Sequence, residues 1–129
     1  MKFAYQISSM KKLIQTEAIV PFFISILLIN RLSVHLAWWI WIPIFLSPDL
    51  SMLGYLINNK FGAFTYNLFH HQLVAIVIAG IGMGLNLPII ELAGIVLLGH
   101  SSLDRVMGYG LKFTTGFRFT HLGTIEKPT

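Results

Sequence analysis

The stretch PIIELAGIVLLGHSSLDRVMGY, residues 88–109, starts as a mainly apolar segment and becomes polar in its second half. That half contains His100, Asp104 and Arg105, although only 11% of the chain is charged. The apolar half is typical of a membrane-spanning helix, and ionisable side chains beside hydrocarbon are costly. These polar groups therefore need either an anchoring role at the membrane edge or a functional reason.

Three further apolar stretches precede this one, at residues 13–30, 34–57 and 61–85. The 129-residue chain is 55% hydrophobic, and its mean hydropathy is +0.73. Each stretch approaches the roughly 20 residues that a helix needs to cross a bilayer core. A soluble protein of this length would lack the polar surface to cover four such helices. The composition predicts an all-α polytopic membrane protein, with a four-helix bundle in residues 1–112 and a short ordered tail in residues 113–129.

Basic residues are distributed unequally between the two predicted sides of the membrane. One side holds Arg31 and the titratable His35, and Arg105 lies near the other side, which holds Lys2, Lys11, Lys12, Lys60, Lys112, Arg118 and Lys127. The positive-inside rule makes the more basic side cytoplasmic, so we expect both termini there and the chain in the cell inner (plasma) membrane. The net charge of +4 does not indicate nucleic-acid binding, because the basic residues cluster at span ends and no soluble domain could hold a duplex.

The second apolar stretch contains a signal that interrupts it. Ser47-Pro48-Asp49 is typical of a new helix start, with serine as the N-cap, proline at the first position and an acid in the first turn. Broken backbone at membrane depth is tolerated only where it is buried in protein or lines a wet cavity. We therefore expect the second span to be broken at this point.

Ionisable groups from all four stretches fall at a similar depth, given a rise of about 1.5 Å per helical residue. The groups that converge in the cytoplasmic half are Glu17, Asp49, His70, His71, His100 and Asp104. His100 and Asp104 lie four residues apart, and so do Tyr66 and His70, so each pair shares a helix face. The coincidence of depth predicts one shared polar site.

Histidine and carboxylate side chains that project inward from facing helices form metal sites in helical bundles. We expect Asp49, His70, His100 and Asp104 to bind a divalent ion. Imidazole and carboxylate ligands suit zinc, iron or manganese, and the chain has no cysteine for softer metals. Whether His70 or His71 faces the site is left open at this point.

Each residue also has a simpler explanation. An intramembrane histidine commonly ties helices together, and Asp49 can complement a helix N-terminus. Asp104 and Arg105 can form an anchoring pair near the interface. Glu91 lies at the opposite end of its helix and about 180° round from His100, so we interpret it as a helix-start acid. The shared site is favoured because acids and histidines of four helices converge, and such residues are functional candidates by default.

The segments SPDLSMLGYL, GAFTYNLFHH, GHSSLDRVMGYGLKF and FRFTHLG together resemble a family of short bacterial four-helix membrane proteins of unknown function. The resemblance covers nearly the whole chain, including Glu17 in the first helix. That family has no established activity, so the resemblance implies an architecture and a set of motif residues.

A weaker similarity links the chain to membrane-bound metal-dependent hydrolases of the LexA-regulated type. The shared order is Pro-Asp, a histidine near a helix start, and His-x-x-x-Asp followed by glycine, which matches Asp49, His70 or His71, His100, Asp104, and Gly108 or Gly110. In that family Pro-Asp usually continues to a second acid, where this chain has Leu50-Ser51, and TYNLFHHQL replaces an Arg-rich Thr-His-Ser segment. The similarity implies metal-dependent hydrolysis.

The first functional hypothesis is a membrane-embedded hydrolase of a lipid or lipid-linked phosphoester, because the site would open at headgroup depth. A bound divalent ion would activate a water molecule and polarise the phosphoryl or acyl oxygen. Glu17 would be a further ligand or a general base, and Lys112 and Arg105 would hold the lipid phosphate. His121 would return from the tail as an acid or a cap on the site.

Two alternatives stay open. A proton or ion pathway would use Glu17, Asp49, His70 and His100 as a relay and would explain the broken span, although the outer half lacks polar residues to complete it. A structural partner subunit would use the polar cluster only to lock the bundle. Membrane lipid is the expected partner, and the small residues at 80–84 permit close association of helices, including in a homo-oligomer.

Overall fold

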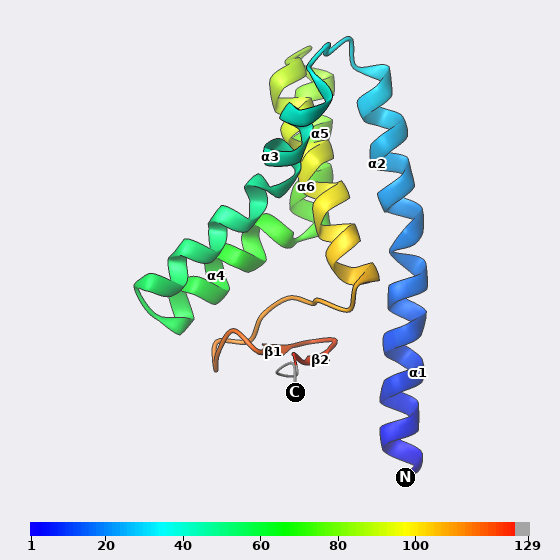
Figure 1. Ribbon diagram of the computed structural model, residues 1–129, viewed down its shortest axis with the longest axis vertical. Helices are drawn as coiled ribbons and strands as arrows, with labels where there is room; N and C mark the ends of the chain where they lie inside the picture. Colours follow the sequence, from blue (N-terminus) through cyan, green and yellow to red (C-terminus); the bar gives the residue numbers. More distant parts are fainter. Residues whose placement is uncertain (126–129) are drawn as a thin grey trace.

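The computed structural model of the chain describes residues 1–125 (Figure 1). Its helices are α1 (Lys2–Glu17), α2 (Ile19–Arg31), α3 (Trp41–Leu46), α4 (Asn59–His70), α5 (Gln72–Gly84) and α6 (Pro88–Val106). Two 3₁₀ helices, η1 (Trp38–Ile40) and η2 (Ser47–Leu56), flank α3. A small antiparallel hairpin of β1 (Phe119–Thr120) and β2 (Gly123–Thr124) follows α6. The predicted all-α class is confirmed.

The first apolar stretch belongs to a longer helical rod made of α1 and α2 (Figure 1). The rod begins at Lys2 instead of residue 13, and it is interrupted only at Ala18. Pro21 explains the interruption, because it has no N–H for the Glu17 carbonyl and its ring crowds that oxygen. Ala18 keeps helical angles, φ −67° and ψ −15°, so α2 continues in nearly the same direction.

The second apolar stretch is broken where the sequence predicts. α3 ends at Leu46, and the ten residues of η2 follow as an unusually long 3₁₀ helix. The prediction that Ser47 caps the new helix is wrong, because its hydroxyl donates backwards to the Ile44 carbonyl at 2.7 Å. The restart therefore depends on Pro48 and Asp49 in the first turn of η2 rather than on a serine cap.

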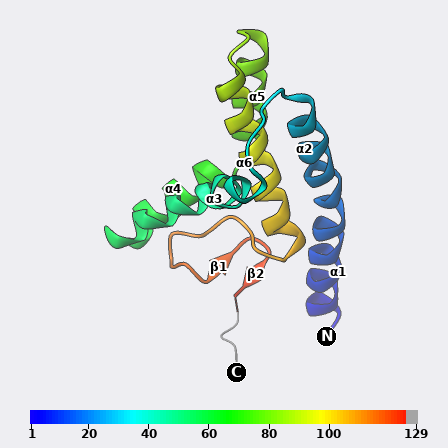
Figure 2. The same ribbon diagram turned by 45° about the horizontal axis from the view of Figure 1, so that its top comes forward.

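η2 and α4 form an antiparallel pair that extends away from the axis of α5 and α6 (Figures 1 and 2). Two glycines allow the close approach, since a Cβ at Gly54 would meet the Thr65 hydroxyl and one at Gly62 would meet the Tyr55 ring. The Thr65 hydroxyl also donates to the Ser51 carbonyl at 2.8 Å. The axes of α4 and α5 differ by 50° at a break at His71, so the third apolar stretch is a bent pair.

α6 is the centre of the molecule, because it contacts α5, α2, α3, α4 and α1. Its buried residues are Gly94, Ile95, Val96, Leu98, Gly99, His100, Ser101 and Ser102. Gly94 lies directly against the backbone of α5 at Ala75 and Ala79, and Gly82 of α5 lies against the start of α6 at Glu91. Of the three glycines at 80–84, only Gly82 makes such a contact, since Gly80 and Gly84 have no neighbour within 4 Å of a built Cβ.

The molecule is apolar outside and partly polar inside. Ser25 is the one buried residue of α2, whereas Val20, Phe23 and Leu27 on the same helix are exposed. Two described segments, Lys2–Arg31 and Trp38–Leu56, are long and apolar enough to cross a membrane, and the bent pair α4–α5 makes a third if it counts as one span. This is consistent with a membrane protein, since exposed apolar surface of this extent needs a nonaqueous neighbour.

α6 is not among these candidate spans of the described residues. It carries three charged residues, Glu91, Asp104 and Arg105, which is more than the two that an 18-residue apolar segment of a candidate span may contain. The four-span bundle and its orientation, with both termini cytoplasmic, stay predictions.

The tail folds back beneath α6 and is tied to α4 (Figure 1). The Asn67 side chain forms two hydrogen bonds with the backbone of Lys112, accepting from its N–H at 2.6 Å and donating to its carbonyl at 2.8 Å. The predicted ordered tail is present up to Ile125, and Lys127, one of the predicted cytoplasmic basic residues, lies outside the described residues.

The contact of Gly94 with α5 leads to a prediction about stability. Gly94→Ala places a methyl group into the Ala79 backbone and should lower the free energy of unfolding by about 1–3 kcal/mol. Gly80→Ala is the matched control, because it fills open space and gains up to about 1 kcal/mol of helix propensity. Thermal unfolding of the detergent-solubilised variants measures both. Equal midpoints for the two variants would contradict the packing described here.

Candidate metal centre

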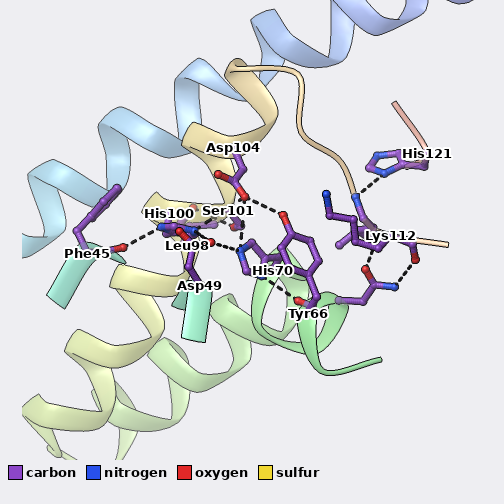
Figure 3. Close-up of polar contacts among 12 residues, drawn as sticks. Phe45, Asp49, Tyr66, His70, Leu98, His100, Ser101, Asp104, Lys112 and His121 are labelled. Atoms are coloured by element: carbon purple, nitrogen blue, oxygen red, sulfur yellow. Dashed lines mark hydrogen bonds and ion pairs between the residues drawn. The ribbon is translucent and has the colours of Figure 1, made fainter. Parts of the chain in front are cut away.

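Four ionisable side chains from three elements meet in one place (Figure 3). Asp49 comes from the first turn of η2, His70 is the last residue of α4, and His100 and Asp104 lie one turn apart on α6. One potential ligand atom from each lies within 4.8 Å of the others. His70 is the histidine that faces the group, whereas His71 is exposed at the start of α5. The convergence of η2, α4 and α6 is thus as the sequence predicts.

The carboxylate oxygens lie close to the Nε2 atoms of both imidazoles. Oδ1 of Asp49 is 3.1 Å from His100 Nε2 and 3.5 Å from His70 Nε2. Oδ2 of Asp104 is 3.5 Å from His70 Nε2 and 3.9 Å from His100 Nε2. Each carboxylate therefore faces both rings.

The other nitrogen of each ring is held by a main-chain carbonyl. His100 Nδ1 donates to the Phe45 carbonyl at 2.8 Å, and His70 Nδ1 donates to the Tyr66 carbonyl at 2.8 Å. Because a carbonyl oxygen can only accept, the ring proton must be on Nδ1 in both neutral imidazoles. Both Nε2 atoms then present lone pairs to the carboxylates, which is the tautomer that a metal-binding histidine adopts.

The local sequence makes the Phe45 carbonyl available to His100. In the 3₁₀ pattern that follows α3, the donor for this carbonyl would be the N–H of residue 48. That residue is Pro48, which has no N–H. The proline that starts η2 thus leaves an acceptor for the His100 ring and places Asp49 beside the same ring.

Tyr66 supports the group from the α4 side. Its hydroxyl donates to Asp104 Oδ2 at 2.9 Å, and its ring stacks on the His70 ring with centroids 3.8 Å apart. Both histidines are 3% exposed. The Asp104 side chain is 17% exposed and that of Asp49 is 37% exposed, so the group opens toward its surroundings at Asp49.

The residues present fit a metal ion. His70 Nε2 is buried and has no hydrogen-bond partner among the described residues. Buried polar atoms normally have a partner, and a metal ion would supply one here. A tetrahedral site with bonds of about 2.0–2.1 Å has ligand-to-ligand edges of about 3.3–3.4 Å. The four Nε2-to-oxygen distances, 3.1 to 3.9 Å, lie around that value. All four potential ligand atoms lie within 4.8 Å of one another, so the group can hold a metal ion once its members draw closer.

Three of the predicted catalytic residues lie beside this group instead of within it. Glu17, Arg105 and His121 line an adjacent pocket of about 520 Å³, together with Gln72. His121 Nδ1 accepts from the Leu111 N–H at 2.8 Å, and burial together with the charge of Arg105 lowers the pKa of His121. The structure places Glu17 in this pocket and outside the four-residue group.

Lys112, the fourth predicted catalytic residue, is buried between aromatic rings. Its Nζ lies 4.1 Å from the centre of the Phe117 ring and 4.9 Å from that of Tyr66. Burial lowers the pKa of Lys112, and the charges of Asp104 and Asp49 oppose that shift. Lys112 therefore lies beside the Tyr66 that holds Asp104 and is not an exposed anchor for lipid phosphate.

Sequence reasoning missed two parts of the site: the main-chain carbonyl that holds His100, and Gln72 at the start of α5. The Phe45 carbonyl carries no side-chain signal, and only the position of Pro48 three residues later could have indicated it. Gln72, which donates to the Ser102 hydroxyl at 2.9 Å, was also missed, because a lone glutamine at a helix start has no distinctive spacing.

Comparison with known proteins identifies a family but no activity. Residues 11–125 match the family described as a domain of unknown function (DUF4260). No curated protein and no solved structure shows a significant match. The match covers most of the 129 residues, and the expected membership of a family of unknown function is confirmed. The chain therefore belongs to the family of proteins that carry the DUF4260 domain of unknown function.

Proposed function

We propose that the protein is a membrane-embedded, divalent-metal-dependent hydrolase that acts on a lipid or lipid-linked phosphoester. Asp49, His70, His100 and Asp104 are the metal ligands. The observation that supports the metal is the pair of Nε2 lone pairs that face two carboxylate oxygens, while both Nδ1 protons are used by main-chain carbonyls.

Without a cation between them, the neutral rings would point two Nε2 lone pairs at two carboxylates. Protonation of the rings would turn these contacts into ion pairs, but protonation of both would put two positive charges on buried rings whose centroids are 5.0 Å apart. A divalent ion satisfies all four ligand atoms at once and balances the two carboxylate charges. Zinc, iron and manganese are the metals that suit two imidazoles and two carboxylates.

The position of the group supports hydrolysis of a lipid substrate. A bound metal ion supplies a water molecule with a pKa near neutrality and polarises a phosphoryl oxygen. Asp49 is partly exposed, so a substrate can reach the group from the side of η2. The exposed apolar residues Leu50 and Leu53 follow Asp49 on the same helix. Arg105 offers a guanidinium next to Asp104 for a phosphate.

Metal analysis tests the ligand set. Purified wild-type protein should contain about one zinc, iron or manganese ion per chain, and His100→Ala should lose it, because removal of one of four ligands weakens binding strongly. His71→Ala is the matched control, since this neighbouring histidine is exposed and lies outside the group. Elemental analysis by mass spectrometry gives the stoichiometry, and circular dichroism checks the fold of each variant.

Two results would contradict the metal centre. One is a folded wild-type protein that takes up none of the three metals at equilibrium. The other is equal metal content in the His71→Ala and His100→Ala variants.

Phosphorus NMR tests the reaction. Metal-loaded protein in mixed micelles should cleave a phosphoester bond in a panel of phospholipids and lipid monophosphates, and a new phosphorus resonance would report the product. EDTA should stop the reaction, and addition of the native metal should restore it, because the ion activates the water. Asp49→Asn should reduce turnover toward background. A protein that holds its metal but cleaves no member of the panel would contradict hydrolysis.

A structural metal is the second candidate function, and one observation favours it. The four ligands join η2, α4 and α6, and four protein ligands around one ion are typical of closed structural zinc sites. Such a protein would lose thermal stability on chelation without catalysing hydrolysis. The metal content and phosphorus NMR measurements together separate this role from the proposed hydrolase.

A further inference from the structure

The pocket beside the metal group lies where four parts of the chain meet. Its polar lining consists of Glu17 at the end of α1, Gln72 at the start of α5, Arg105 near the end of α6 and His121 in the tail, and Ile14 and Val20 line it as apolar residues. We propose that this pocket binds a phospholipid headgroup that carries a phosphate and an N–H or O–H donor, as phosphoethanolamine does. The proposal rests on the proposed function in that Arg105 directly follows the ligand Asp104.

One side of the pocket offers donors for a phosphate. Arg105 is half-buried, and its guanidinium makes no hydrogen bond or ion pair with any described residue. His121 Nδ1 accepts from the Leu111 N–H, so in the neutral ring the proton is on Nε2, which is therefore a donor. Guanidinium groups bind phosphate through two parallel hydrogen bonds, and this is among the strongest anion contacts in proteins.

The other side of the pocket offers acceptors. Glu17 lines the pocket, and its carboxylate forms no ion pair with Arg105 within 4.0 Å. Pro21 also leaves the Glu17 carbonyl without its usual helical donor. Gln72 uses its amide N–H on Ser102, which leaves its amide oxygen free to accept. A ligand that bears both an anion and a donor group therefore matches the pocket better than a plain phosphate.

The surroundings connect the pocket to the metal group and to lipid. Arg105 also lines a narrow space with Tyr66, His70 and Asp104, so this residue lies between the pocket and the candidate ligands. Val20 lines the pocket, and Phe23 one turn along α2 is 58% exposed. Acyl chains can follow this apolar side of α2 while the headgroup occupies the polar lining, which favours a lipid over a soluble phosphoester.

Isothermal titration calorimetry on the full chain in detergent, first as purified and then with EDTA present, tests the pocket and shows whether its binding depends on the metal. The probes are short-chain phosphatidylethanolamine, short-chain phosphatidylcholine and free phosphoethanolamine. Phosphatidylethanolamine should bind more tightly than phosphatidylcholine, whose quaternary ammonium has no N–H to donate. Arg105→Gln should weaken its binding by about tenfold to a hundredfold, because a charged hydrogen-bond donor is lost. Arg118→Gln, an exposed arginine of the tail that lines none of these spaces, is the matched control.

Further variants and probes assign the acceptor side and the source of the ligand. Glu17→Gln should remove the preference for phosphatidylethanolamine over phosphatidylcholine. Arg105→Lys keeps the charge and should restore part of the affinity, which excludes a folding defect as the cause of the Arg105→Gln loss. Tighter binding of the lipid than of phosphoethanolamine supports a membrane ligand, whereas equal binding overturns the lipid assignment and leaves a soluble headgroup.

Equal affinities in the Arg105→Gln and Arg118→Gln proteins would overturn the pocket as a phosphate site. This failure is distinct from a failure of the proposed hydrolase. A wild-type protein that binds no metal but shows Arg105-dependent lipid binding refutes the metal centre and supports the pocket. Normal metal content together with lipid binding that does not depend on Arg105 supports the metal centre and refutes the pocket.

Discussion

The hydrogen bond from His100 Nδ1 to the Phe45 carbonyl holds the middle of α6 against the end of α3. It exists because Pro48 cannot supply the N–H that a 3₁₀ turn would bring to that carbonyl. The bond orients the His100 ring so that Nε2 faces Asp49. Asp49 directly follows Pro48 in the first turn of η2. One break in a helix therefore provides both the acceptor that fixes a ring and the carboxylate that faces it.

The polar interior of the molecule follows from the same need to satisfy backbone and side-chain groups away from water. Ser25, Ser101 and Ser102 each donate to a carbonyl three or four residues earlier in their own helix. Ser25 also lies against Gly99, where the missing side chain lets α2 approach α6. Unsatisfied polar groups are expensive in hydrocarbon, so these contacts allow helices with apolar outer faces to carry a polar site between them.

Asp104 and Arg105 connect two neighbouring sites because consecutive residues on a helix point about 100° apart. Asp104 faces η2 and α4, where it meets His70 and the Tyr66 hydroxyl. Arg105 faces the pocket at the junction of α1 and α2. This arrangement places the candidate metal group beside a pocket whose lining carries both donors and acceptors.

The amino-acid sequence alone indicated the helical class, the apolar stretches, the break at Ser47 and the four residues of the candidate metal group, because periodicity, hydropathy and proline act locally. It could not choose between His70 and His71, since that depends on where α4 ends and on the 50° angle between α4 and α5. It also grouped Glu17 with the ligands by depth alone, whereas the tertiary structure put Glu17 in the adjacent pocket. Depth along a helix follows from residue count, but the direction in which a side chain faces follows from the packing of helices far apart in the chain.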